Sequence, residues 1–377
     1  MSNRRWVGPR LTLTAFCAIV WAMRAQLIYN PVAGPRDAAD DMARVLTYLE
    51  RQGWEITLRQ TFGPGDATTY AHDAAAAGYD MVIAAGGDGT IGEVASGLAH
   101  SDCRLGVLPV GTGNVWAHTV GIPVWTPMHR DALLEAAQIL IEGRDHRIDL
   151  GRVGGRYFVL WAGIGFDAQV THDIEPHREV RRALGQLSYY VTAVVLAFSL
   201  RGTRVSLDID GETYRHRALM ILVTNVPLYG QSFYLAPQAQ LDDGWLDLYV
   251  FKGGNTLDAF RQFGLLLLGK HLGDPSIETY RVRRVEVHSE KPLPLHLDGD
   301  PAGYSPLTIE VAPKALRVVV PPAASLALSG GGSLPVGEPS SLAGRIAAYL
   351  RQERRRLFEE GERIREYWER RLGLSRE

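Results

Sequence analysis

The stretch Ala84-Ala85-Gly86-Gly87-Asp88-Gly89-Thr90 lies between an apolar run, Met81 to Ala85, and a helical pattern that begins at Thr90. Its glycines allow the backbone to turn tightly and to direct N–H groups at an anion, and the helix start adds a favourable dipole. The P-loop pattern GxxxxGK[ST] does not occur in the chain. The stretch therefore predicts a phosphate-binding turn. Thr90 and Glu93 also fit the capping box T-x-x-E, so a purely structural Glu93 is an alternative.

Two further turns of the same kind follow predicted strands. Gly111-Thr112-Gly113-Asn114 follows the run Leu105 to Pro109, and Asn30 to Gly34 follows the first apolar run of the chain. The carboxyl ends of parallel strands meet at one edge of a sheet, where α/β proteins bind ligands. The three turns together predict a site for the phosphates of a nucleotide.

The composition bounds the class of protein. The chain has 377 residues, of which 46% are hydrophobic and 22% charged, and its net charge is -2. These values indicate a globular protein of about two domains and argue against a nucleic-acid partner. Cys17 and Cys103 are the only cysteines, so the sequence predicts no disulfide framework and favours the reducing cytoplasm.

The pattern of strands and helices changes along the chain. Apolar runs alternate with helical stretches in residues 25–145, which predicts an α/β domain with a parallel sheet. Strand-like runs dominate residues 146–325 and predict an antiparallel β domain, with a helical insertion at Leu187 to Leu200. Residues 326–341 are rich in Gly, Ser and Pro and predict a linker.

The two ends of the chain are interpreted separately. Residues 1–24 are an expected N-terminal extension, with Met23 as the expected start of the protein. The apolar stretch Leu11 to Met23 is shorter than the roughly 20 residues a bilayer span needs, and a weak membrane-touching segment is the alternative. Residues 342–377 predict an amphipathic helix with arginines on its polar faces. Packing on the enzyme itself, a homodimer contact and transient peripheral attachment to a membrane surface are the open alternatives for that helix.

Six motifs resemble a known family. They are LIYNPVAG (residues 27–34), AAGGDGTIGEV (84–94), LGVLPVGTGNVWA (105–117), GIGFDAQV (163–170), YLAPQAQLDDGWLDLYVF (234–251) and LHLDGDPAG (295–303). In order and spacing they are similar to the catalytic region of diacylglycerol kinases, sphingosine kinases and their bacterial lipid kinase relatives. The resemblance covers about residues 25–322. It implies an α/β fold class, with an N-terminal NAD kinase/diacylglycerol kinase-like domain built on a parallel sheet and a C-terminal antiparallel β-sandwich domain.

The resemblance also implies the site residues. ATP would be held by Asn30, Pro31, Val32, Ala33, Gly34, Thr61, Gly86, Gly87, Asp88, Gly89, Thr90, Ile91, Gly92, Glu93 and Thr112. Relatives often have Asn at position 92, and an acidic and an aromatic residue where this chain has Val115 and Trp116. Asp300 takes the place of the general base, which is usually Glu in the family.

Two magnesium sites are expected. The Asp88 carboxylate would lie among the phosphates of ATP, where it suits binding of Mg²⁺ or of a substrate hydroxyl. Alternatively, Asp88 forms the turn by a bond to its own backbone. The resemblance implies a structural Mg²⁺ at the DDG loop, bound by the Asp243 carboxylate and the backbone carbonyls of Gln240 and Trp245. Oxygen ligands suit this hard cation.

The expected reaction is in-line transfer of the ATP γ-phosphate, with Mg²⁺, to the hydroxyl of a lipid alcohol such as diacylglycerol or a sphingosine-like base. Asp300 would accept the hydroxyl proton. The apolar channel that such a substrate needs has as candidate lining Trp116, Trp161, Phe166, Tyr229, Phe233 and Tyr234. An NAD kinase and a catalytically silent ATP-binding regulator are the two alternative functions.

Overall fold

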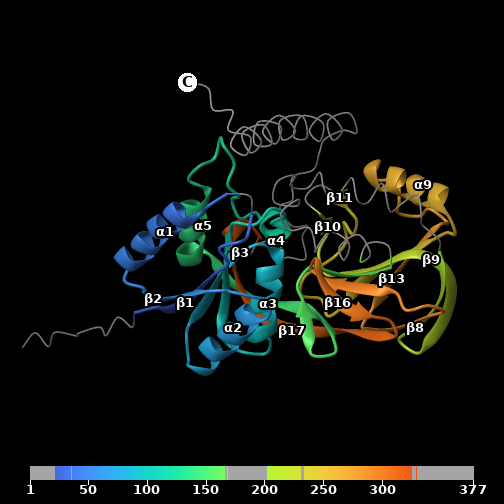
Figure 1. Ribbon diagram of the computed structural model, residues 1–377, viewed down its shortest axis with the longest axis horizontal. Coiled ribbons are helices and arrows are strands. Elements are labelled where there is room, and N and C mark those ends of the chain that lie inside the picture. The colour runs from blue at the N-terminus through green and yellow to red at the C-terminus, as the bar shows by residue number, and fades with distance from the viewer. Residues whose placement is uncertain are drawn as a thin grey trace, which may run out of the picture.

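The computed structural model describes residues 22–34, 36–165, 168, 202–230, 233–324 and 328. The predicted helices at 187–200 and 342–377, the sequence expected to form the linker (Leu328 excepted) and most of the N-terminal extension lie outside these residues. Figure 1 shows an end with helices and parallel strands beside an end that is mainly β-sheet. No helix of the described residues is long and apolar enough to cross a membrane.

Parallel strands form the core of the first half of the chain. They are β1 (Arg24–Tyr29), β2 (Glu55–Gln60), β3 (Met81–Gly86) and β4 (Arg104–Pro109), in the order β2-β1-β3-β4. Every residue of β3 is buried, as expected for a central parallel strand with both faces covered. The five helices between and after these strands are α1 (Ala39–Arg51), α2 (Asp66–Ala76), α3 (Asp88–Leu98), α4 (Val115–Val120) and α5 (Ala132–Glu142).

One long strand joins the two halves of the molecule. β17 (Leu307–Val320) pairs in parallel with β4 and antiparallel with β5 (Arg144–Val153) and β14 (Arg284–Ser289). The last strand of the described chain therefore reaches back to the first sheet. Its pairing makes the α/β sheet and the antiparallel strands continuous.

Antiparallel strands dominate the second half. Their spatial order is β16-β15-β7-β9-β8-β14-β17. The bounds are β6 (Arg156–Phe158), β7 (Trp161–Gly165), β8 (Thr203–Ile209), β9 (Glu212–Thr224), β10 (Leu228–Tyr229), β11 (Phe233–Tyr234), β12 (Leu246–Lys252), β13 (Ile277–Val282), β15 (Pro294–Leu297) and β16 (Asp300–Tyr304), with the helix α9 at Thr256–Leu267.

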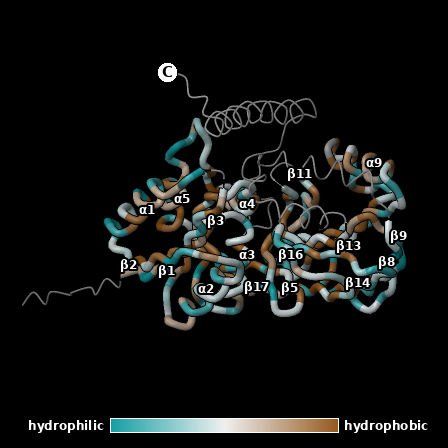
Figure 2. Tube along the Cα trace, in the orientation of Figure 1, coloured by the Kyte–Doolittle hydropathy of each residue, from teal (hydrophilic) through white to brown (hydrophobic). Residues whose placement is uncertain are grey.

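The structure divides two of the strand-like runs in residues 146–325. Tyr157 to Ala162 spans parts of β6 and β7, and Arg281 to His288 spans the end of β13 and most of β14. The first run breaks at Val159 and Leu160, which donate backbone N–H bonds to a side chain instead of a strand partner. Val159 and Leu160 belong to the hydrophobic core that includes the α/β strands, whereas Phe158 and Ala162 belong to a second core among the antiparallel strands. Figure 2 shows hydrophobic residues in both ends of the molecule.

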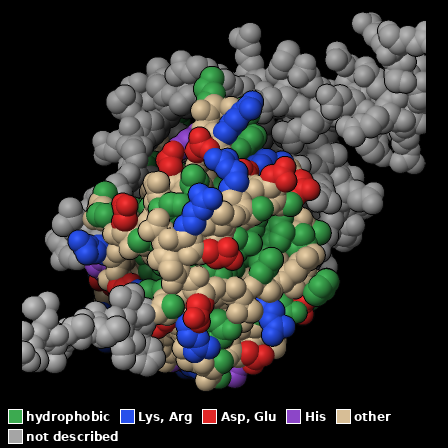
Figure 3. Space-filling model, turned by 90° about the vertical axis from the view of Figure 1, so that its left-hand side faces the viewer, with side chains coloured by type: hydrophobic (Ala, Val, Ile, Leu, Met, Phe, Trp, Pro, Cys, Tyr) green, Lys and Arg blue, Asp and Glu red, His purple; other side chains and the backbone are tan. Residues whose placement is uncertain are grey.

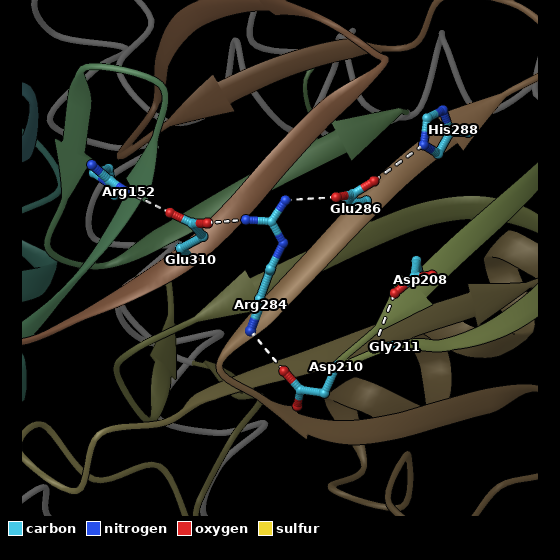
Figure 4. A network of polar contacts seen from close by, with 8 residues as sticks. All are labelled: Arg152, Asp208, Asp210, Gly211, Arg284, Glu286, His288 and Glu310. Atoms are coloured by element: carbon cyan, nitrogen blue, oxygen red, sulfur yellow. Dashed lines mark hydrogen bonds and ion pairs between the residues drawn. The ribbon is translucent and has the colours of Figure 1, made fainter.

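Charged residues lie on the surface in mixed groups. On neighbouring strands β5, β17 and β14, Glu310 accepts a bond from Arg152 at 2.5 Å and pairs with Arg284, which also bonds Glu286 at 2.6 Å (Figure 4). Such half-exposed ion pairs each contribute little, about 0.2–1 kcal/mol. At the α/β end, described residues of both signs are interspersed with hydrophobic ones (Figure 3).

Candidate active site

The glycine turns meet at the carboxyl edge of the parallel sheet. The Asn30 N–H donates to the Ala85 carbonyl at 2.9 Å, and the Val110 N–H donates to the Gly86 carbonyl at 3.1 Å. A Cβ atom built on Gly34 would lie 2.1 Å from the Val110 carbonyl oxygen. One on Gly111 would lie 2.4 Å from the Gly87 Cα. The structure therefore brings the three predicted turns into backbone contact, which only residues without a side chain allow.

The turn after β3 leads into α3 two residues earlier than expected. Gly87 is the N-cap, and Asp88 is the first helical residue. Thr90 therefore lies inside the first turn, where its hydroxyl accepts a bond from the Asn30 side chain at 3.0 Å. The predicted capping box of Thr90 and Glu93 is wrong, because the helix has already begun before Thr90.

Glu93 stabilises a different helix. Its carboxylate accepts backbone N–H bonds from Gly65 at 2.9 Å and Ala67 at 3.2 Å, at the start of α2. The first N–H groups of a helix have no partners within it, so Glu93 satisfies two of these donors. The loop that follows Thr61 is held in the same region, since the Thr61 N–H donates to the Tyr29 carbonyl at 2.9 Å.

Asp88 connects the second glycine turn to the third. Its carboxylate accepts N–H bonds from Val115 at 3.0 Å and Trp116 at 3.1 Å, at the start of α4. Burial raises the pKa of Asp88, and these N–H bonds oppose the rise. The residues that depart from the family pattern at 115 and 116 thus contribute backbone amides, which any residue other than proline can supply.

The sequence predicted no separate role for Asp298, the first carboxylate of the turn between β15 and β16. It is buried, and it accepts N–H bonds from Val159 at 2.8 Å, Leu160 at 2.9 Å and Trp161 at 3.0 Å. Burial raises its pKa to about 7; the three N–H bonds lower it, and the charge of Asp88 raises it further. The sequence shows two aspartates at 298 and 300, and only the fold distinguishes the buried one.

Asp300 lies against the second glycine turn. A Cβ on Gly89 would be 2.6 Å from its Oδ2 atom, and a Cβ on Gly92 would be 2.9 Å from Oδ2 of Asp298. The two glycines of α3 therefore make room for the two carboxylates of the LDGD motif. Gly92, one of the two positions at which the family resemblance implied a departure, faces Asp298.

The DDG loop lies beside another buried carboxylate, Asp149. This residue accepts N–H bonds from Gly244 and Lys314, both at 2.6 Å. Burial raises the pKa of Asp149, and the charges of Asp243 and Asp242 raise it further. Asp243 accepts the Trp245 N–H at 3.0 Å and pairs with Arg281.

These contacts bear on the predicted magnesium site in two ways. The crowding of carboxylates suits a cation, whereas Arg281 already neutralises part of the Asp243 charge. Nowhere in the part of the chain that the structure describes do three or more His, Cys, Asp or Glu side chains form a metal-binding group. A metal at this loop would therefore depend on backbone carbonyls such as those of Gln240 and Trp245.

The predicted lining residues have different surroundings. Trp116 is fully buried in the core. The rings of Trp161 and Tyr229 lie 5.2 Å apart, and Tyr229 is paired with Phe233 across β10 and β11. Tyr234 is half-buried next to Phe233. Phe166 lies outside the described residues.

Comparison with known proteins gives matches over both halves of the chain. The model of the diacylglycerol kinase catalytic domain matches residues 24–153, and that of the YegS C-terminal NAD kinase β-sandwich-like domain matches residues 161–320. The diacylglycerol kinase of Bacillus subtilis (strain 168) is 38% identical over 300 residues, which are 79% of this chain and 96% of that protein.

More distant relatives match over a similar length. The diacylglycerol kinase of Staphylococcus carnosus (strain TM300) is 28% identical, over 79% of this chain and 95% of that protein. A crystal structure of a diacylglycerol kinase from Bacillus anthracis str. Sterne superposes with a TM-score of 0.65 at 25% identity and covers 80% of this chain and 98% of that one. These matches confirm the predicted fold class, an α/β domain followed by an antiparallel β-sandwich.

Proposed function

The chain belongs to the diacylglycerol kinase family of ATP-dependent lipid kinases, and we propose that it transfers the γ-phosphate of ATP to the free hydroxyl of diacylglycerol. One observation carries the proposal: three backbone turns suited to phosphate lie in contact, and the Asp300 carboxylate of the β-sandwich faces one of them at Gly89. The site therefore combines a holder for the donor phosphates with a base for the acceptor.

The phosphate-binding part would be the edge formed by Asn30 to Gly34, Gly86 to Gly92 and Thr112, with Thr61 on the adjoining loop. Backbone N–H groups in tight turns and at the start of a helix bind anionic oxygens without a charged side chain. Contact of Gly111 with Gly87 holds two of these turns in one arrangement. Such fixed positioning supplies much of the catalysis in phosphoryl transfer.

Asp300 would be the general base. Its carboxylate accepts the hydroxyl proton of the lipid while the hydroxyl oxygen forms a bond to the γ-phosphorus and the bond from that phosphorus to the ADP oxygen breaks. The products are the phosphorylated lipid and ADP. Asp298 has a different role, because its carboxylate accepts three backbone N–H bonds and is buried away from solvent. It positions the turn from which Asp300 projects.

Mg²⁺ would accompany ATP and neutralise charge on its phosphates. The buried Asp88 carboxylate lies between two phosphate turns, where a nearby cation would offset its burial. At the DDG loop, a second Mg²⁺ would use the Asp243 carboxylate with the carbonyls of Gln240 and Trp245. That site would stabilise the fold where β12 begins.

The experiment follows label from γ-labelled ATP, with Mg²⁺, into an extractable product from diacylglycerol, sphingosine or NAD. We expect labelled phosphatidic acid from wild type and a loss of at least about 100-fold in Asp300→Asn, since general bases contribute about 10²–10⁴-fold. Asp300→Glu, which restores a carboxylate, should retain more transfer than Asp300→Asn.

Other outcomes would reject parts of the proposal. Full turnover by Asp300→Asn would rule out Asp300 as the base. Label in sphingosine alone would change the acceptor, and label in NAD alone would identify an NAD kinase. ATP binding without transfer to any acceptor would identify a regulator.

A further inference from the structure

Two exposed apolar side chains lie beside the phosphate turns. Val32, in the turn after β1, is 61% exposed, and Phe62, in the loop after β2, is 84% exposed. Single exposed apolar residues are ordinary on a protein surface. These two differ, because Val32 belongs to the turn Asn30 to Gly34 and Phe62 directly follows Thr61, both of which are expected to contact the phosphates of ATP. Both side chains therefore lie at the rim of the candidate active site.

The sheet brings the two residues to the same edge. β1 and β2 are neighbouring parallel strands, and Tyr29 is paired with Gln60. The Thr61 N–H donates to the Tyr29 carbonyl at 2.9 Å, so the two strands end at the same level. Val32 comes three residues after Tyr29, and Phe62 comes two residues after Gln60. The two residues therefore leave neighbouring strands at the carboxyl edge, where the three glycine turns also meet.

Hydrogen bonds hold the turn that carries Val32 against the other phosphate turns. The Asn30 side chain accepts the Val32 N–H at 3.1 Å through Oδ1 and donates to the Thr90 hydroxyl at 3.0 Å through Nδ2. Thr90 lies in the first turn of α3, the helix that begins at the second glycine turn. The contacts that arrange the phosphate site therefore also set the position of Val32.

The loop that carries Phe62 is equally constrained. The Asp66 carboxylate accepts the N–H groups of Phe62 at 2.8 Å and of Gly63 at 2.9 Å. The Glu93 carboxylate of α3 accepts the N–H of Gly65 at 2.9 Å. The loop and the second glycine turn are thus joined through α3. The backbone at Phe62 is held by hydrogen bonds while its ring remains exposed to solvent.

The chemistry of this rim suits a nucleobase. Asp66 and Glu93 already accept backbone N–H bonds, which offset part of their negative charge beside the phosphate turns. What remains exposed at the rim is an aromatic ring and an aliphatic side chain. An aromatic ring stacks on the π-face of any base, and the strength of stacking depends on the area of contact. A two-ring purine therefore covers more of the Phe62 ring than a one-ring pyrimidine does.

We propose that Phe62 stacks on the nucleobase of the phosphate donor, with Val32 as a second apolar contact, and that this stacking makes the enzyme prefer purine nucleotides. The inference deepens the proposed function and rests on it, since the glycine turns must hold the donor phosphates. The lipid acceptor takes no part in the contact. Binding measurements without lipid therefore test it directly.

The test is isothermal titration calorimetry of the full-length protein in Mg²⁺, with ATP, CTP and inorganic tripolyphosphate in separate titrations. Phe62→Ala should bind ATP about tenfold more weakly, because the stacking contact is lost. Its affinity for tripolyphosphate, which has no base, should equal that of wild type. The preference of wild type for ATP over CTP should shrink in Phe62→Ala. Phe62→Trp, which restores an aromatic ring, should bind ATP at least as tightly as wild type.

Steady-state transfer to diacylglycerol gives a second readout. Phe62→Ala should raise KM for ATP about tenfold and leave kcat unchanged, as expected of a contact that is equally strong in the ground state and the transition state. Leu58→Ala is the matched control, because Leu58 is also an apolar residue of this edge strand, 49% exposed, four positions before Phe62. That variant should keep the wild-type affinity for all three ligands.

Equal affinity of wild type and Phe62→Ala for ATP would overturn the proposal. An equal loss of ATP and tripolyphosphate binding would also overturn it, since Phe62 would then act through the fold of the phosphate turns. A wild-type dimer that Phe62→Ala dissociates would overturn it in favour of contact with a second copy of the chain. Failure of the kinase function is recognised separately, as ATP binding that depends on Phe62 without transfer to any acceptor.

Discussion

Replacement of Gly111 by alanine tests whether contact between the second and third glycine turns is required for both stability and catalysis. The new Cβ would lie 2.4 Å from the Gly87 Cα and 3.1 Å from the Gly87 nitrogen. Non-bonded carbon atoms pack at about 3.5–4.0 Å, so the turns must separate by roughly 1 Å. Both atoms belong to the backbone, and no side-chain rotation can relieve the clash.

The size of the effect follows from that displacement. Overpacking of this kind costs about 1–3 kcal/mol, and the lower entropy of the unfolded alanine chain offsets about 0.4–1 kcal/mol of it. A shift of about 1 Å in a catalytic group can cost about 100-fold in rate. We therefore expect Gly111→Ala to lower the free energy of unfolding by about 1–2 kcal/mol and kcat/KM for ATP by about 100-fold.

Urea unfolding and steady-state kinetics at varied ATP measure the two quantities. Gly155→Ala is the matched control, because a Cβ at Gly155 would meet no atom within 4 Å. That variant should stay within about 0.5 kcal/mol of wild type and keep its kcat/KM. Wild-type stability and kinetics in Gly111→Ala would refute the contact between the turns and with it the arrangement of the phosphate site.

Two further predictions concern buried and clustered carboxylates. Burial raises the pKa of Asp298 to about 7 in the folded protein, whereas its pKa is about 3.9 in the unfolded chain. Between these pH values the folded protein binds a proton that the unfolded chain does not bind. The folded state therefore loses stability as the pH rises toward 7. Urea titrations measure the unfolding free energies of wild type and of Asp298→Asn. The value for wild type minus that for the variant should fall by about 1.4 kcal/mol for each pH unit between pH 5 and 7. A difference that stays constant with pH would contradict the burial of the charge. For the DDG loop, Mg²⁺ without nucleotide should raise the Tm of wild type and leave that of Asp243→Asn unchanged; an equal rise in both would place the cation elsewhere.

The local patterns of the α/β domain could be predicted well. The runs Met81 to Ala85 and Leu105 to Pro109 agree with β3 and β4 to within one residue, and the glycine turns follow β1, β3 and β4 as expected. An apolar run bounded by glycines specifies a buried parallel strand from its own residues, so neighbouring sequence is sufficient. The resemblance of the motifs then indicated the family and the two-part fold before any contact was known.

The roles of individual polar residues could not be predicted in the same way. Glu93 fits a capping box in sequence, yet it caps α2, more than 20 positions earlier in the chain. The helix α9 was not predicted, and no local pattern states that its glutamine is buried and its phenylalanines exposed. Such outcomes depend on which distant segment covers each side chain.

What the sequence by itself determined was the local chemistry: strands, glycine turns, and the aspartates of the GGDG, DDG and LDGD motifs. Only the tertiary structure decided which carboxylate does what. Asp298 is fixed by backbone N–H groups 137–139 positions away in the chain, whereas Asp300, two residues later, faces Gly89. The physical reason is that turn geometry is set by a few neighbouring residues, whereas burial, and the pKa that follows from it, is set by every segment that packs around a group.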